Sequence, residues 1–514
     1  MLSRTFSSGI SGISGFEVVV ECSSWSRIPR FELVGLPDAA VKEAKNRVQS
    51  ACENSGMRFP PLDIMVNLAP ANRKKEGTAF DVAILCAILQ SYGTIPHSLD
   101  LSDKCLIGEL SLSGDLRPID GVLPMTVAAR DSGKAEIFVP FENRGEAAVV
   151  SGIKVFGVRS VRELIDHLKG ESLIEPEKSS GDEFDFSARN TELDFADVRG
   201  QLKAKRALEI AAAGGHNVLM IGPPGAGKSM LAKRIPSILP DLSLDEAIET
   251  TKIHSVTGLL NTSLITERPF RSPHHTVSLV GFVGGGANPR PGEISLAHNG
   301  VLFLDELPEF PKNVMEALRQ PIEDGVVTVT RAAAKVTYPS KLMLIAAMNP
   351  CKCGFFGDPR RQCTCTPAAA RKYLDKISGP LLDRIDIQIE LPAVSYNEIS
   401  GKTAKGEPSA KIRERVNAGR RFTNERLLRG GDRPGILNAT MSSELMRKYC
   451  TPTDAAADLM RRAYEQLGLS ARGHDKVLRV ARTIADLDGI EVINEDHIAE
   501  AIMYRSLDRK YWNR

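Results

Sequence analysis

The sequence predicts a multidomain α/β protein, and three features of its 514 residues support this prediction. A glycine-rich octapeptide lies between an apolar run and a helical run, which is the order expected of a P-loop α/β sheet. Before it, short apolar runs alternate with helical patterns, and the C-terminal part has helical spacing throughout. At about 100–200 residues per domain, a chain of this length holds roughly three domains.

The N-terminal part, residues 1–170, is predicted to be an α+β domain, because runs such as FEVVV and IKVFGV alternate with helical patterns such as AFDVAILCAILQSYG. Residues 171–192 are acidic and polar without a periodic apolar face, which is typical of a linker. Residues 193–396 contain the apolar runs NVLMIG, VLFLDE, VVTVTR and KLMLIAAMN, which we expect to be strands of the P-loop core. Residues 397–514 are predicted to form a helical domain.

Composition excludes several classes of protein. Hydrophobic residues make up 42% of the chain and charged residues 25%, with no apolar run long enough to cross a membrane. The first twenty residues lack the layout of a cleaved signal, and five of the nine cysteines are scattered, which favours a reducing compartment. We therefore expect a cytoplasmic protein. The net charge of +2 indicates that any contact with nucleic acid must be local.

The octapeptide GPPGAGKS is the strongest local signal for function. Because it follows a strand and begins a helix, its backbone N–H groups can turn toward phosphates at a helix N-terminus. Lys228 is expected to reach the phosphates of ATP, and Ser229 is expected to bind Mg²⁺. A chance glycine-rich turn is the alternative. The predicted nucleotide-binding residues are Gly222, Pro223, Pro224, Gly225, Ala226, Gly227, Lys228 and Ser229.

Two further strands are expected to bring polar side chains to the same site. VLFLDE ends in two acids, of which Asp305 would hold Mg²⁺ and Glu306 would orient and polarise the attacking water. LMLIAAMN ends at Asn349, whose amide could hold that water opposite Glu306. The alternatives are two solvated acids at the end of a strand, and a turn residue before Pro350.

Two arginines are candidates for contact with the γ-phosphate. Arg384, in GPLLDRIDI, resembles an arginine finger supplied by a neighbouring subunit, which would require the protein to oligomerise. The alternative for Arg384 is an ion pair with Asp383 or Asp386 of the same chain. Arg472, at the start of a C-terminal helix, could reach the phosphate from a helical lid, and Arg479 is the second candidate for that role.

Five long strings, in the same order, resemble the YifB/ComM family of magnesium-chelatase-like AAA+ ATPases: GPPGAGKS, RPFRSPHHT, GGGANPRPGEISLAHNGVLFLDE, AAMNPCKCG and GPLLDRID. The resemblance covers nearly the whole chain. It implies an ATP-dependent ring and supports Arg472 as the lid arginine. The ComM branch further implies a hexameric DNA helicase that drives branch migration in homologous recombination when transforming DNA is integrated. Its implied partners are single-stranded or branched DNA and recombination proteins.

The N-terminal domain resembles the protease domain of Lon, which implies a fold of the ribosomal S5 second-domain type. Aligning KKEGTAFDVAILCA with the segment that carries the protease nucleophile places Ala79 at the serine, and the corresponding alignment for the catalytic lysine places Met125 there. A Ser–Lys dyad needs both a nucleophile and a base, so we predict a domain without peptidase activity. Thr78 and Ser113 lie nearby and would serve only in a shifted alignment.

Two segments are candidates for contact with DNA. Residues 272–298 are rich in glycine and proline, as loops that line the pore of a ring can be. Residues 326–340 are predicted to form a hairpin whose tip presents Arg331 and Lys335 to a phosphate backbone, with an ordinary surface hairpin as the alternative. His274 and His275 are expected to pack within their loop rather than bind a ligand.

Four cysteines lie close together in CKCGFFGDPRRQCTC. Four thiolates suit tetrahedral Zn²⁺, although the usual spacing of such ligands is C-x₂₋₄-C rather than C-x-C. Free thiols or a redox pair are the alternatives. We expect a structural zinc site that stiffens the loop after Asn349 and performs no chemistry. Its ligands would be Cys351, Cys353, Cys363 and Cys365.

Two other functions compete with that of a DNA motor. In the first, the same ATPase core drives insertion of Mg²⁺ into a porphyrin through a partner subunit. The true chelatase ATPase lacks the Lon-like region, which weighs against this function. In the second, the protein remodels other proteins as a chaperone or protease, and here Ala79 and Met125 weigh against proteolysis.

Overall fold

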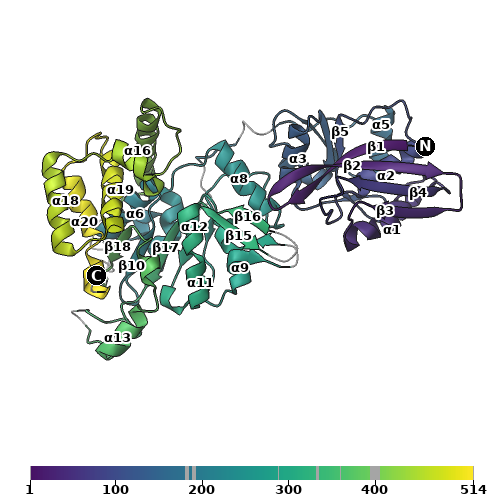
Figure 1. Cartoon of the computed structure of the whole chain (residues 1–514). Coiled ribbons are helices and arrows are strands. Elements are labelled where there is room, and N and C mark those ends of the chain that lie inside the picture. The colour runs from purple at the N-terminus through teal and green to yellow at the C-terminus, as the bar shows by residue number, and fades with distance from the viewer. Residues whose placement is uncertain are drawn as a thin grey trace. The chain divides into compact units, whose positions relative to one another are not determined.

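The computed structural model describes residues 2–179, 184–187, 193–286, 289–330, 335–358, 361–393 and 406–512. The chain forms two compact units (Figure 1). The first comprises Met1–Asp185 and Leu244–Thr266, and the second comprises Phe186–Ser243 and Glu267–Arg514. Among the described residues, no helix combines the length and apolarity needed to cross a membrane.

Two sheets form the framework of the first unit. One has the strand order β1-β2-β4-β3, in which β3 runs parallel to β4 and the other pairs are antiparallel. Alternate residues of β2 are buried, because successive side chains of a strand point to opposite faces of the sheet. The other sheet is parallel and has the order β5-β8-β9. Strands β6 and β7 form a separate antiparallel pair. The strands are β1 (Leu2–Ser11), β2 (Ser14–Trp25), β3 (Arg30–Val34), β4 (Asp63–Ala69), β5 (Lys104–Leu106), β6 (Glu109–Leu110), β7 (Leu116–Arg117), β8 (Glu136–Pro140) and β9 (Lys154–Val158).

The helices of the first unit pack on these sheets. Helix α1 begins where the carboxylate of Asp38 accepts a hydrogen bond from the Val41 N–H, and α2 is buried along nearly its whole length. Helix α8 packs on α3, although the prediction placed it in the P-loop core. The helices are α1 (Ala39–Asn54), α2 (Asp81–Tyr92), α3 (Val122–Asp131), α4 (Arg144–Ala147), α5 (Val161–Lys169) and α8 (Leu244–Ser255).

A five-stranded parallel sheet with the order β11-β14-β17-β10-β18 forms the centre of the second unit. Its inner strands are fully buried apolar runs, as expected of a parallel sheet covered on both faces. Strand β17 lies between β10 and β14, so the carboxyl ends of these three strands meet at one edge. The strands are β10 (Val218–Ile221), β11 (Phe270–Arg271), β14 (Val301–Leu304), β17 (Met343–Met348) and β18 (Ile387–Glu390).

The run VVTVTR is not part of this sheet. It forms β15 (Val326–Thr330), which pairs with β16 (Lys335–Pro339) in a separate antiparallel hairpin, as the hairpin prediction has it. A second small ladder joins β12 (Gly284–Gly285) to β13 (Arg290–Pro291). The helices around the sheet are α6 (Leu202–Gly214), α7 (Lys228–Arg234), α9 (Leu279–Val283), α10 (Glu293–Leu296), α11 (Lys312–Ala317), α12 (Arg319–Asp324), α13 (Pro367–Leu374) and α14 (Gly379–Leu382).

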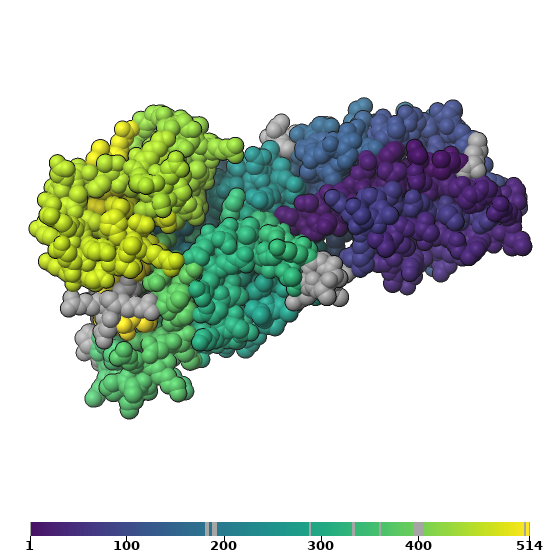
Figure 2. Space-filling model, in the orientation of Figure 1, coloured from purple at the N-terminus to yellow at the C-terminus, as the bar shows by residue number. Residues whose placement is uncertain are grey.

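The C-terminal part of the second unit is helical and shares one hydrophobic core with the sheet. Helix α19 packs against α6, α16 and α20, and its Arg482 is fully buried beside Asp486. Figure 2 shows these helices gathered at one side of the unit, in yellow-green. They are α16 (Ser409–Arg429), α17 (Ser443–Tyr449), α18 (Asp454–Leu467), α19 (Ala471–Leu487), α20 (Glu495–Met503) and α21 (Leu507–Trp512).

Candidate functional site

The predicted P-loop turns from β10 into α7 at the carboxyl edge of the central sheet. Gly225 and Gly227 have φ angles of +78° and +90°, a region that residues with a side chain rarely adopt. A Cβ atom at Gly222 would lie 2.5 Å from the carbonyl oxygen of Leu391. Gly225 and Gly227 are therefore required by the backbone conformation, and Gly222 is required because no side chain fits beside Leu391.

Lys228 is the first residue of α7, and its side chain is folded back into the loop. Its ammonium group donates hydrogen bonds to the carbonyl oxygens of Gly222 (2.7 Å) and Pro223 (3.0 Å) and to Oδ1 of Asn349 (3.0 Å). Burial lowers the pKa of Lys228 to about 8, and the charges of Asp305 and Glu306 act in the opposite direction. The predicted phosphate-binding lysine thus contacts the predicted sensor amide directly.

Asp305 and Glu306 follow β14 but face different surroundings. Oδ2 of Asp305 accepts a 2.5 Å hydrogen bond from the hydroxyl of Ser229, and its Oδ1 accepts one from the Glu306 N–H at 2.9 Å. Because the two oxygens of Ser229 and Asp305 are in contact, one hard cation could bind both, and oxygen ligands of this kind suit Mg²⁺. Glu306 is exposed, with a left-handed φ of +53°, a strained conformation that is often found at functional sites.

His275 is a site residue that the sequence reasoning missed. His274 is exposed, and its Nδ1 lies 2.9 Å from Oγ1 of Thr276 in the same loop. The imidazole of His275, in contrast, lies with Nδ1 3.8 Å from Oε2 of Glu306 and packs edge-on against Phe310. The available signal was the pair of histidines beside a proline in the string RPFRSPHHT, between the octapeptide and the acidic pair.

Arg384 forms an ion pair within its own chain, and Asp386, one of the two predicted acids, has other partners. The Arg384 side chain is only 9% exposed and pairs with Glu323 at the end of α12, and it also donates to the carbonyl oxygen of Pro380 at 2.6 Å. Asp386 instead lies 3.3 Å from the ammonium group of Lys476 and 3.4 Å from the imidazole of His216. The arginine-finger role remains a prediction, and it requires Arg384 to exchange Glu323 for a phosphate.

The two candidate lid arginines differ in their surroundings. Arg472, in the first turn of α19, is exposed. Arg479, two turns later, donates to the carbonyl oxygens of Ala439 (3.1 Å) and Met441 (2.7 Å) and contacts the sulfur of Met446. Arg479 thus holds helices of the C-terminal part together, which leaves Arg472 as the better candidate for a nucleotide sensor.

The positions aligned with the Lon dyad are buried in one apolar cluster of the first unit. Ala79 and Met125 are each 4% exposed and share this cluster with residues of β5, β8 and β9. The nearby hydroxyls of Thr78 and Ser113 each donate to a carboxylate, of Glu109 and Asp115 respectively, at 2.6 Å. Ala79 and Met125 thus pack as apolar core residues, and the absence of peptidase activity stays a prediction.

The two predicted DNA segments lie side by side. The fully buried Tyr338 of β16 donates a 2.5 Å hydrogen bond to the carbonyl oxygen of Pro289, in the glycine-rich segment. Lys335, at the start of β16, is exposed. Arg331, the other predicted contact, lies outside the described residues.

The four clustered cysteines also come together in the structure. Their sulfur atoms all lie within 4.8 Å of one another, so they form a group that could hold a metal ion. Cys351 is buried, and Cys353, Cys363 and Cys365 are half-buried.

Comparisons with known proteins agree with this arrangement. Residues 194–399 match the family described as magnesium chelatase, subunit ChlI, and residues 20–143 and 406–505 match two further ChlI families, the second named for its C-terminal part. The competence protein ComM of Haemophilus influenzae is 41% identical over 513 residues, which cover 99% of this chain and 98% of that protein.

Two other relatives extend the comparison. YifB of Escherichia coli strain K12, described as an uncharacterized protein, is 42% identical over 503 residues, which cover 97% of this chain and 96% of that protein. Lon protease 2 of Bacillus subtilis is 27% identical over 129 residues, or 25% of this chain and 23% of the protease. With identity above 40% along nearly its full length, this chain belongs to the YifB/ComM family of magnesium-chelatase-like AAA+ proteins.

Proposed function

We propose that this protein is an ATP-hydrolysing, ring-forming DNA translocase or helicase that promotes branch migration in homologous recombination, in the course of integrating transforming DNA. The observation that carries the ATPase part is the meeting of Lys228, Ser229, Asp305 and Asn349 at one edge of a parallel sheet. The competence part is supported by the 41% identity with the competence protein ComM. We place the proposed hexamer in the cytoplasm, with recombination proteins as further partners.

Each residue at this edge has a distinct role in the proposed hydrolysis of ATP. Bound ATP would supply the phosphoryl group that is transferred to water, and Mg²⁺ would neutralise the charge on the phosphate oxygens. Lys228 and the loop N–H groups bind phosphate oxygens, and Ser229 and Asp305 hold the metal. Glu306, exposed and next to His275, orients and polarises the water, with Asn349 on its other side. Arg384 from a neighbouring subunit and Arg472 from the lid are proposed to stabilise the charge that develops on the phosphate.

The DNA part of the proposal rests on the hairpin β15–β16 and the glycine-rich segment. The buried Tyr338 connects the hairpin to that segment through a hydrogen bond, so we expect the two to move together. The exposed Lys335, with Arg331, offers positive charge to a phosphate backbone in the channel of a ring. Translocation would follow if hydrolysis shifts this paired surface.

The deciding experiment measures the ATPase rate of the full chain alone, with single-stranded DNA and with forked DNA, beside Glu306→Gln. The variant keeps the size of the side chain but removes its charge, so we expect it to bind ATP and to hydrolyse it about 10²–10⁴-fold more slowly. Strong stimulation by DNA that is lost in the variant supports the proposal and justifies branch-migration assays. An ATPase rate that DNA does not change would contradict the DNA part while leaving the ATPase part intact.

Two findings favour second candidates. The three matching family descriptions all name a magnesium-chelatase subunit, which favours a chelatase-type motor acting on a partner protein. The similarity to Lon protease 2 favours a protein-remodelling chaperone. Adding unfolded protein in place of DNA to the same assay separates these functions, because only a chaperone should be stimulated by it.

A further inference from the structure

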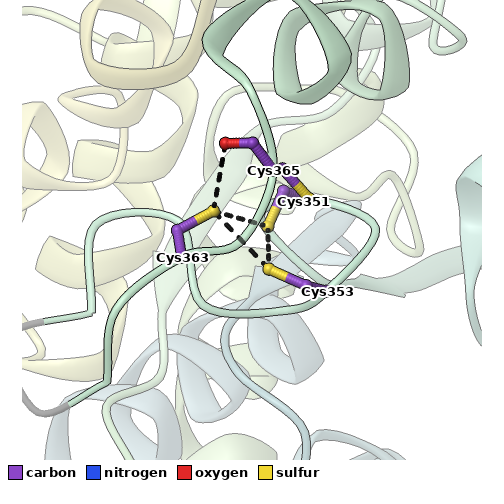
Figure 3. Close-up of side chains that lie close together, drawn as sticks. All are labelled: Cys351, Cys353, Cys363 and Cys365. Carbon is purple, nitrogen blue, oxygen red and sulfur yellow. Dashed lines mark hydrogen bonds between the residues drawn. The ribbon is translucent and has the colours of Figure 1, made fainter.

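Four cysteine side chains converge in the loops that follow β17 (Figure 3). The sulfur of Cys351 lies 3.3 Å from that of Cys353 and 3.7 Å from that of Cys363, and the sulfurs of Cys353 and Cys363 are 3.5 Å apart. A 3.0 Å hydrogen bond from the Gly354 N–H to the carbonyl oxygen of Cys351 closes the turn that carries the first two cysteines.

These distances distinguish between the possible roles of the cluster. A disulfide requires sulfur atoms about 2.05 Å apart, and these four cysteines are free thiols. Four sulfurs at about 2.3 Å from a tetrahedral zinc ion lie about 3.8 Å from one another. The separations among Cys351, Cys353 and Cys363 are close to this value, and the sulfur of Cys365 lies within 4.8 Å of the other three. A set of four thiolates also suits Zn²⁺ rather than Mg²⁺ or Ca²⁺, which prefer oxygen ligands.

One side of the cysteine loop packs against the P-loop. Cys351 follows Asn349 by two residues, so the first ligand and the sensor amide belong to one short segment. Gly354, with a φ of +89°, lies directly on Pro224: a Cβ atom there would be 2.5 Å from Cδ and 2.8 Å from Cγ of that proline. No side chain larger than hydrogen fits between the cysteine turn and the phosphate-binding loop.

The other side of the loop leads into α13. Next to Cys365, the hydroxyl of Thr366 accepts a hydrogen bond from the Ala369 N–H at 3.2 Å and thereby caps this helix. Tyr373 of α13 is buried, which raises the pKa of its hydroxyl, and the backbone of Asn349 acts on that pKa in the opposite direction, so the two residues lie close together. The cysteine loop and the helix that follows it therefore approach the nucleotide site at two places, Gly354 and Tyr373.

We propose that Cys351, Cys353, Cys363 and Cys365 bind one Zn²⁺, and that this ion braces the P-loop and Asn349 for nucleotide hydrolysis. The ion performs no chemistry on ATP. It fixes the turn at Gly354 against Pro224 and holds α13, through Tyr373, beside Asn349. The metal site stands independently of the DNA motor, and only its effect on hydrolysis rests on the proposed ATPase function.

The first test measures metal content by mass spectrometry of the full chain, purified without added metal. We expect one zinc per chain in the wild type and in the control Cys52→Ala, which removes a buried cysteine outside the cluster. The double variant Cys363→Ser/Cys365→Ser should retain less than a tenth of that zinc. A wild-type chain that holds no zinc, that holds iron instead, or that loses none in the double variant would overturn the metal assignment.

The second test separates the brace from the metal. Gly354→Ala keeps all four thiolates, so its zinc content should equal that of the wild type. The variant nevertheless forces a Cβ atom against Pro224. Because groups that support a site from outside typically contribute 10–100-fold, we expect its ATPase rate to fall about tenfold. If Gly354→Ala hydrolyses ATP at the wild-type rate, the contact between the cysteine loop and the P-loop does not support hydrolysis, and this part of the proposal is refuted. A wild type that binds zinc but hydrolyses no ATP would refute the proposed function instead.

Should the double cysteine variant fail to fold, a third measurement replaces it. A thiol-reactive mercurial added to the wild-type chain releases zinc to a colorimetric chelator, and ATPase activity is followed in the same sample. We expect zinc release and loss of activity to proceed together, and both to be reversed by excess dithiol and Zn²⁺. Full activity after complete zinc release would contradict the brace.

Discussion

Lys228 binds three oxygen atoms in the free chain, and its burial makes the protonated form costly. Its pKa is lowered to about 8, so the side chain is an ammonium below pH 8 and becomes neutral as the pH rises through that value. Phosphate binding requires the ammonium. The affinity of the chain for ATP should therefore fall above pH 8, approaching about tenfold per pH unit because one proton is taken up on binding.

Titration calorimetry of ATP binding between pH 7 and 9.5 checks this expectation. Adenosine, which carries no phosphate, serves as the control ligand, and its affinity should stay constant over the same range. An affinity for ATP that is also constant would mean that Lys228 keeps its proton throughout.

At the scale of elements, a buried ion pair ties α19 to the edge of the central sheet. Lys476 lies 3.3 Å from Asp386 and donates to the carbonyl oxygen of Ile385 at 2.9 Å. Burial lowers the pKa of Lys476 to about 8; burial alone would raise the pKa of Asp386, but Lys476 and His216 together hold it below its usual value. Lys476→Met leaves a buried carboxylate without its main partner, so the free energy of unfolding should fall by about 3–5 kcal/mol.

Denaturant unfolding measures this loss. The double variant Lys476→Met/Asp386→Asn should recover much of it, because the uncompensated charge is removed. Arg461→Met on α18 is the matched control: Arg461 pairs with Asp458 on the surface, and its loss should leave the unfolding curve unchanged. Equal effects of Lys476→Met and Arg461→Met would show that the buried pair does not stabilise the fold.

The hairpin β15–β16 is the element predicted to contact DNA. If Lys335 contacts a phosphate, Lys335→Ala should weaken DNA binding and lower the slope of log affinity against log salt concentration by about one. Fluorescence anisotropy with labelled single-stranded DNA at several salt concentrations gives this slope. Lys203→Ala, which removes an exposed lysine of α6, is the control and should leave the slope unchanged. A Lys335→Ala slope equal to that of the wild type would assign the hairpin a structural role.

At the scale of the whole molecule, the sequence predicted the position of a site residue best where its motif directly follows a strand in the chain. The octapeptide, the acidic pair and Asn349 could be placed at one edge because each follows an apolar run, and parallel strands bring their carboxyl ends together. Partners distant in sequence could not be foreseen. The pairing of Arg384 with Glu323 and of Asp386 with Lys476 depends on how separate helices pack, and local sequence patterns do not encode this packing. For the same reason the sequence did not show that α8 packs on α3.

Arg384 can reveal whether neighbouring subunits share one nucleotide site. If this arginine acts on a neighbouring subunit's nucleotide, Arg384→Ala should lower the ATPase rate by about 10³-fold or more. Glu306→Gln alone should be similarly inactive. When the two variants are mixed, some interfaces combine the intact Glu306 of one chain with the intact Arg384 of the next, so activity should return. An arginine that acts within its own chain allows no such recovery, because no chain in the mixture carries both groups.

The ATPase rate of the mixture across a range of ratios decides between these outcomes, and activity should be highest near equal amounts. Glu323→Gln is the control, because it removes the ion-pair partner of Arg384 but keeps the arginine, and it should retain hydrolysis in the unmixed protein. A mixture no more active than its components, together with an active Glu323→Gln chain, would show that Arg384 acts within its own chain. Recovery would show that hydrolysis needs the assembled ring, since one subunit completes the site of the next.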